Sequence, residues 1–141
     1  MSIAVICVLI AILMPALTNI VGKVTAGKGY DNNSPRVWLE KQTGWRQRAY
    51  WAHQNHLEAV APFAAAVILC LVAGVDRAWL DQWAAIFIAV RLVYTLIYLA
   101  NIGPLRTLVW MGGAAIVVWM LVKAGMALAV VAPVAAPVVG G

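Results

Sequence analysis

Four apolar stretches, each long enough to cross a lipid bilayer, account for most of this 141-residue chain. A helix that spans a hydrocarbon core of about 30 Å needs roughly 20 residues at about 1.5 Å each. We expect such helices over residues 2–22, 45–74, 79–102 and 104–131. With 65% hydrophobic and only 11% charged residues, the chain is far too apolar for a water-soluble domain. The sequence therefore predicts an all-α membrane protein, a single domain of four antiparallel transmembrane helices.

The connections between these helices differ in length and composition. Residues 23–44 contain several glycines, asparagines and a proline, which are typical of turns, so we expect an irregular loop. The other two connections are very short, which favours antiparallel neighbours. The stretch 132–141 is rich in alanine, valine and proline, and we expect no regular helix there. Because no basic residue precedes the first apolar stretch, we interpret it as a retained helix rather than a cleaved signal peptide.

Positive charge is concentrated on one side of the predicted bundle. The loop 23–44 and its flanks hold Lys23, Lys28, Arg36, Lys41, Arg46 and Arg48. The opposite side has mainly Arg77 and Lys123. By the positive-inside rule we expect the loop in the cytoplasm and both termini outside. Because we find no targeting segment, we expect a bacterial cytoplasmic membrane, with lipids as partners. This orientation accounts for the net charge of +5, so we expect no nucleic-acid partner.

Polar residues form a stripe on the second predicted helix. At about 100° per residue, its four members fall within an arc of about 80°; they are Arg48, Trp51, Asn55 and Glu58. Pro62 continues the same face and cannot donate a backbone hydrogen bond to the carbonyl of Glu58. We therefore expect a bend there and a carbonyl oxygen open to a ligand, a water or another helix.

A second stripe, on the third helix, consists of Arg91, Tyr94 and Tyr98, and Arg106 begins the fourth helix near the cytoplasmic rim. A charged side chain at mid-membrane costs roughly 2.5–3.5 kcal/mol, so such residues usually have a function. Because the two stripes lie at similar depth, they predict a site for a polar, zwitterionic ligand. The alternative is structural: Glu58 and Arg91 form an ion pair that fixes the helix register.

Two histidines raise the question of a metal or haem. His53 and His56 are three residues apart, but neither lies on the polar stripe, and the chain has no other histidine. The two cysteines, Cys7 and Cys70, lie toward the other leaflet. We expect no metal or haem, and interpret the histidines as neutral imidazoles that form hydrogen bonds.

These motifs resemble a known family. The string RAYWAHQNHLE of residues 48–58, then Pro62-Phe63, then Arg91-Leu92-Val93-Tyr94 with Tyr98 and Arg106, is similar to the MAPEG family of membrane-associated proteins in eicosanoid and glutathione metabolism, above all to its uncharacterised bacterial branch. The resemblance covers about residues 46–113. It implies a homotrimer of four-helix bundles that binds glutathione as co-substrate between subunits and receives a lipophilic molecule from the bilayer.

The resemblance also implies roles for individual residues. The expected ligand-binding residues are Arg48, Asn55, Glu58, Arg91, Tyr94 and Tyr98, and the expected catalytic residue is Arg106, which would stabilise the glutathione thiolate. The implied activity is that of a glutathione transferase or peroxidase on lipophilic electrophiles. At one position the pattern differs: glutathione-using members carry an arginine four residues before the asparagine, where this chain has Trp51.

A second function class stays open at the level of the sequence. Because a fold does not determine activity, the polar face is also compatible with a non-catalytic protein. Such a protein would bind a lipid headgroup, or would act as a scaffold or accessory subunit of a larger membrane complex.

Overall fold

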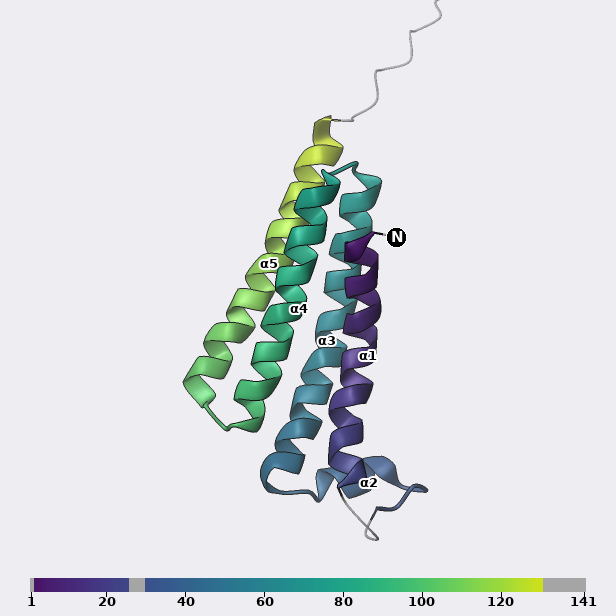
Figure 1. Cartoon of the computed structure of the whole chain (residues 1–141), viewed down its shortest axis with the longest axis vertical. Coiled ribbons are helices and arrows are strands. Elements are labelled where there is room, and N and C mark those ends of the chain that lie inside the picture. The colour runs from purple at the N-terminus through teal and green to yellow at the C-terminus, as the bar shows by residue number, and fades with distance from the viewer. Residues whose placement is uncertain (1, 26–29, 131–141) are drawn as a thin grey trace, which may run out of the picture.

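The computed structural model, which describes residues 2–25 and 30–130, is an antiparallel bundle of four long helices (Figure 1). The long helices are α1 (Ile3–Val24), α3 (Gly44–Val72), α4 (Arg77–Leu99) and α5 (Gly103–Val130). Each is long and apolar enough to cross a membrane. Within the described ranges every regular element is helical. The predicted all-α architecture with four potential membrane spans is confirmed.

The structure differs from the predicted organisation in the first connection. A short helix, α2 (Pro35–Glu40), interrupts the loop that we expected to be irregular over residues 23–44. Proline is well suited to the first position of a helix, because the N–H that it lacks would have no partner there. On the inner side of α2, Leu39 is buried. The expectation of an irregular tail at 132–141 falls outside the described residues.

The helices α3 and α4 occupy the middle of the bundle. Each of them packs against both α1 and α5, which lie on the two flanks. At the centre the rings of Phe63 and Phe87 stack with their centroids 4.0 Å apart, and both side chains are buried. Toward the end that carries the α4–α5 connection, the α4–α5 pair diverges from α1 and α3 (Figure 1). The polar stripes of α3 and α4 lie in this diverging half.

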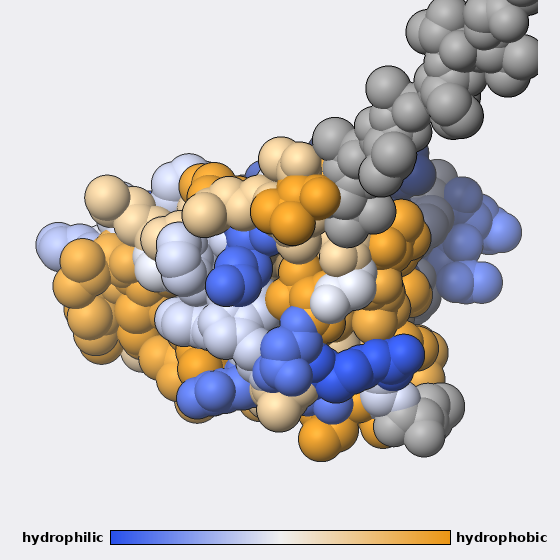
Figure 2. All heavy atoms as spheres, turned by 90° about the horizontal axis from the view of Figure 1, so that it is seen from above, coloured by the Kyte–Doolittle hydropathy of each residue, from blue (hydrophilic) through white to orange (hydrophobic). Residues whose placement is uncertain are grey.

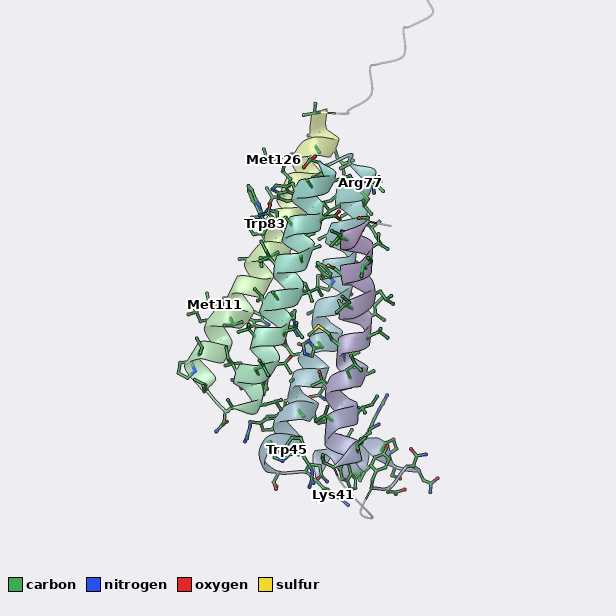
Figure 3. All side chains as sticks on the ribbon, in the orientation of Figure 1. Lys41, Trp45, Arg77, Trp83, Met111 and Met126 are labelled. Atoms are coloured by element: carbon green, nitrogen blue, oxygen red, sulfur yellow. The ribbon has the colours of Figure 1, made fainter. Side chains whose placement is uncertain are left out.

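The surface separates apolar flanks from polar ends. Viewed along the bundle, hydrophobic residues cover much of its sides (Figure 2), and many large apolar side chains on all four long helices are exposed. Lys41 lies beside α2 at one end, and Arg77 lies at the opposite end (Figure 3). This distribution suits an integral membrane protein whose sides face lipid.

The return from α4 to α5 is a tight turn centred on Asn101, which has φ 64°. Asparagine tolerates this left-handed backbone conformation better than most residues. The N–H of Ile102 donates to the carbonyl of Ile97 over 3.3 Å, and the N–H of Asn101 donates to that of Tyr98 over 3.1 Å. These two bonds form the helix-ending arrangement known as the Schellman motif. The short return places the first turn of α5, with Arg106, close to the last turn of α4.

Asp81 of α4 provides the cap that α1 lacks. Its Oδ1 accepts hydrogen bonds from the N–H of Ala4 over 2.7 Å and from the hydroxyl of Ser2 over 2.8 Å. Because a helix-capping interaction contributes about 1 kcal/mol, we expect Asp81→Ala to lower the thermal unfolding midpoint in detergent by a few degrees. The exposed neighbour Gln82, replaced by alanine, is the control. Equal midpoints for both variants would contradict a capping role.

Candidate functional site

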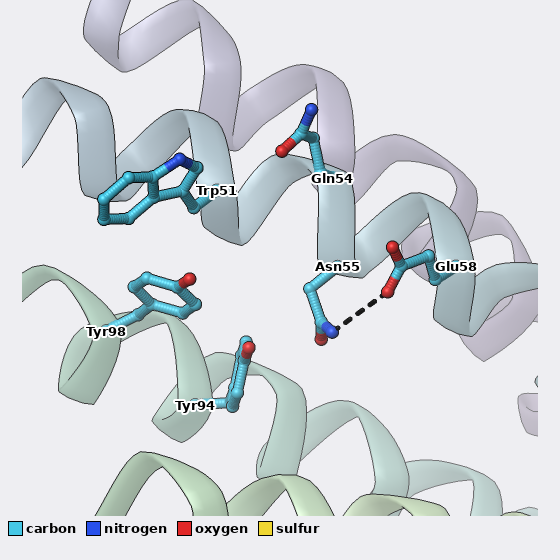
Figure 4. A pocket seen from close by; sticks show the side chains of 6 residues that line it. All are labelled: Trp51, Gln54, Asn55, Glu58, Tyr94 and Tyr98. Atoms are coloured by element: carbon cyan, nitrogen blue, oxygen red, sulfur yellow. Dashed lines mark hydrogen bonds between the residues drawn. The ribbon is translucent and has the colours of Figure 1, made fainter. Parts of the chain in front are cut away.

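A polar pocket of about 350 Å³ lies between α3 and α4. It is lined by Trp51, Gln54, Asn55 and Glu58 of α3 and by Tyr94 and Tyr98 of α4 (Figure 4). The side chains face each other because both sets recur at steps of three or four, which keeps them on one side of each helix. The structure therefore brings together four of the predicted ligand-binding residues.

Arg91 lies behind this pocket, in the interior of the bundle, with only 4% of its surface exposed. Its Nη1 donates to Oδ1 of Asn55 over 2.9 Å, and its Nε and Nη2 contact Nδ1 of His56 at 3.2 and 2.7 Å. Its guanidinium also lies 4.7 Å from the ring centroid of Tyr94. Arg91 thus orients residues that line the pocket, and its own donors are used inside the protein.

His56 is the site residue that the sequence did not identify. It is 2% exposed, and since Nδ1 accepts from Arg91, the proton of the neutral ring belongs on Nε2. Nε2 lies 2.8 Å from Oγ1 of Thr95, which in turn donates to the carbonyl of Arg91 over 2.9 Å. The three residues therefore form a closed hydrogen-bonded circuit around a neutral imidazole. From the sequence we had expected His56 to form hydrogen bonds as a neutral imidazole, but not that its partner would be Arg91.

Asn55 connects the buried arginine to the pocket carboxylate. Its Nδ2 donates to Oε2 of Glu58 over 3.3 Å, while its Oδ1 accepts from Arg91. Among the described residues, no direct ion pair joins Glu58 to Arg91, so the register-fixing pair considered above does not form. The side chain of Glu58 is exposed. Its charge is therefore available to a ligand or to a neighbouring chain.

The two remaining arginines have different surroundings. Nε of Arg48 donates to the carbonyl of Leu99 over 2.9 Å, which satisfies an open acceptor at the end of α4, and Arg48 does not line the pocket. Arg106 lies with its guanidinium 4.7 Å from the ring centroid of Tyr98. It lines an adjoining cavity of about 290 Å³ together with Asn55, Tyr94, Tyr98, Thr107 and Trp110. Arg106 thus places a cation in the cavity next to the polar pocket.

An apolar cavity of about 320 Å³ continues from the polar site toward the middle of the bundle. At its polar end lie Asn55, Glu58 and Arg91, and its apolar lining includes Pro62, Phe87, Trp110, Val117 and Leu121. Polar and apolar cavities therefore meet at the same two side chains, Asn55 and Glu58. This arrangement can hold a hydrophilic and a lipophilic molecule next to each other.

The histidines face different helices. Nδ1 of His53 lies 2.8 Å from the carbonyl of Pro15 in α1, whereas His56 faces α4. In the part of the chain that the structure describes, no three histidine, cysteine or acidic side chains are grouped as ligands for a metal ion. The histidines thus serve as hydrogen-bond partners between helices.

In a comparison with protein families, the model of the MAPEG family matches residues 3–126, which include all of α1, α3 and α4 and most of α5. Comparisons with curated proteins and with solved structures found no significant match. The similarity therefore extends beyond the motifs of α3 and α4 to nearly the whole described bundle.

Proposed function

This chain belongs to the MAPEG family of membrane proteins, and we propose that it binds glutathione at the polar site and acts as a glutathione transferase or peroxidase on lipophilic electrophiles. The observation that carries the proposal is the exposed carboxylate of Glu58 on a helix long enough to span the membrane. Lipid would not tolerate this charge without compensation. A polar ligand in the adjoining pocket provides that compensation.

The chemistry of glutathione matches the charges around the pocket. Its ammonium group pairs with Glu58, and its thiol lies toward Arg106, where a cation favours the thiolate, the nucleophilic form. In the transferase reaction the thiolate forms a carbon–sulfur bond and the leaving group takes the displaced electron pair. In the peroxidase reaction the thiolate attacks one oxygen of a lipid hydroperoxide and the O–O bond breaks. The sulfur becomes a sulfenic acid, and the alkoxide takes up the proton that the thiol released and leaves as an alcohol. A second glutathione then converts the sulfenic acid to the disulfide and water.

The apolar cavity supplies the place for the second substrate. It begins at Asn55 and Glu58 and continues along Phe87 and Val117. A lipophilic electrophile that has dissolved in the bilayer would enter along α5 and meet the thiolate where the two cavities join. Holding both reactants in one geometry is itself a large source of rate acceleration.

We further propose that the protein is a homotrimer in a bacterial cytoplasmic membrane, with residues 23–44 in the cytoplasm. A neighbouring subunit would cover the open side of the site and shield Glu58 from lipid. Chemical crosslinking in lipid nanodiscs tests this assembly, and we expect a ladder that ends at three subunits. A ladder that ends at one or two subunits would contradict a site shared within a trimer.

Calorimetric titration of the detergent-purified protein with glutathione tests the site. Because a hydrogen bond to a charged group contributes about 1.5–3 kcal/mol, we expect Glu58→Gln to weaken binding by about 10- to 100-fold. The matched control is Glu40→Gln, since Glu40 is exposed on α2, away from the pocket.

The absence of heat with the wild-type protein at millimolar glutathione would overturn the proposed function. Equal affinities of the Glu58→Gln variant and the wild type would instead leave glutathione as a ligand but remove it from this pocket.

A further inference from the structure

We propose that Trp110 holds the flat, conjugated part of the second substrate next to the thiolate, so that the site selects planar electrophiles. The proposal rests on the proposed function, since it names the class of electrophile that the same site accepts. It follows from the place of Trp110 between two cavities, from its position one turn after Arg106 and from the order of side chains along the apolar cavity.

Trp110 lies where the cavity that Arg106 lines meets the apolar cavity. Among the described residues, Asn55 and Trp110 alone line both of them. The amide of Asn55 is already used, since its Oδ1 accepts from Arg91 and its Nδ2 donates to Glu58. Trp110, by contrast, is 46% exposed. Its indole is therefore the large side chain at this junction that a second molecule can contact.

The spacing along α5 places the indole beside the reacting atoms. Arg106 and Trp110 are four residues apart, so they lie on the same face of the helix, about 6 Å apart along its axis. In a reactive complex the sulfur and the atom that it attacks are about 3–3.5 Å apart. If the thiolate lies beside Arg106, the attacked atom therefore lies within contact of Trp110 and not in the deeper part of the apolar cavity.

The lining of the apolar cavity changes along α5. Trp110 is followed on this face by Gly113 and Ala114, and then by Val117 and Leu121. Side chains on a helix point back over the preceding turn, so a long side chain at 113 or 114 would cover the indole. Glycine and alanine leave it open. The cavity thus offers an uncovered aromatic face at the end nearest the thiolate and aliphatic walls beyond it, which suits a flat conjugated group at the reacting end of the substrate.

A flat electrophile on Trp110 can react by simple substitution. In a chloronitroarene the sulfur forms a bond to the ring carbon that carries chlorine, and the ring and its nitro groups take up the electron pair. The pair returns as the carbon–chlorine bond breaks, chloride leaves, and the proton of the thiol goes to water. Aromatic groups stack in an offset arrangement, so the indole covers one face of the ring and leaves the other face to the sulfur.

Conjugation rates in reconstituted vesicles test the proposal with two electrophiles, 1-chloro-2,4-dinitrobenzene and 1-iodooctane. Both lose a halide to a thiolate, but only the first is flat. Each rate is divided by the rate with glutathione alone, which removes the difference in intrinsic reactivity. A stacking contact changes affinity by about 2- to 10-fold. We expect the wild type to accelerate the flat arene more by this factor, and Trp110→Leu to raise the KM for the arene equally at unchanged kcat, without an effect on 1-iodooctane.

Further variants separate stacking from a general loss of structure. Trp110→Phe keeps an aromatic face and should retain most of the preference for the arene. The matched control is Trp119→Leu, because Trp119 is an exposed tryptophan of α5 that lines neither cavity. The proposal is overturned if the wild type accelerates both electrophiles equally, or if Trp110→Leu impairs the reactions of both to the same extent.

The unreactive arene 1,3-dinitrobenzene, which has no leaving group, distinguishes this proposal from the proposed function in calorimetric titrations without glutathione. If it binds the wild type and is weakened by Trp110→Leu, while glutathione gives no heat, Trp110 holds flat ligands and the glutathione-dependent function is wrong. If glutathione binds but 1,3-dinitrobenzene binds the wild type and Trp110→Leu equally, or binds neither, the function stands and the role of Trp110 is wrong.

Discussion

Replacing Arg106 by alanine is expected to lower the rate of conjugation of a lipophilic model electrophile by about 10²- to 10³-fold at saturating glutathione. Removal of one preorganised group that stabilises developing or fixed negative charge typically has an effect of this size. Arg106 is the cation that faces the cavity shared with Asn55, Tyr94 and Tyr98, and its guanidinium is held over the ring of Tyr98. The measurement is the initial rate in reconstituted vesicles, with glutathione affinity determined in parallel.

Two further variants show whether the lower conjugation rate of Arg106→Ala comes from the loss of the positive charge at this position. Arg106→Lys retains the charge but not the planar group that lies over the ring, so we expect an intermediate rate. Arg77→Ala removes a cation from the other end of the bundle and should leave the rate unchanged. If Arg106→Ala conjugates the electrophile at the wild-type rate, Arg106 does not stabilise the thiolate, and another group must do so.

The sequence predicted the helices and the polar faces well because both depend on regular periodicity. Hydrophobic length determines where a chain can cross a membrane, and steps of three and four place Asn55, Glu58, Tyr94 and Tyr98 on facing sides of α3 and α4. The proline and glycine content of residues 23–44 was less informative about secondary structure. It predicted an irregular loop, whereas in the structure Pro35 begins the short helix α2.

The sequence could not predict which of the arginines on the polar stripes line the cavities and which are used elsewhere in the bundle. The angular position of a residue on a helix gives its face, but a long side chain can reach a neighbouring helix instead of the space in front of it. Arg48 lies on the polar stripe and yet reaches the end of α4. His56 lies off the stripe and yet binds Arg91, because it faces α4 rather than the pocket. These outcomes depend on packing between helices that are distant in sequence.

The buried circuit of Arg91, His56 and Thr95 leads to the second large effect. We expect His56→Leu to destabilise the protein by about 3–5 kcal/mol, because it leaves a buried guanidinium without its main acceptor. Arg91→Met should cost less, about 1–3 kcal/mol, since it leaves only neutral groups without a partner. Unfolding by sodium dodecyl sulfate in mixed micelles measures both variants on one scale. His53→Leu, which loses a hydrogen bond to the carbonyl of Pro15, is the matched control and should cost about 1 kcal/mol.

The double variant tests whether the circuit acts as a unit. If the cost of His56→Leu comes from an uncompensated charge, removing that charge as well should recover part of the loss, so the double variant should be more stable than the sum of the single effects by about 0.5–3 kcal/mol. Strictly additive effects would contradict the circuit. Glutathione affinity should still fall in the double variant, because Asn55 loses the donor that fixes its amide beside Glu58. Recovery of stability without recovery of binding would show that the polar interior serves the pocket and not only the packing of α3 against α4.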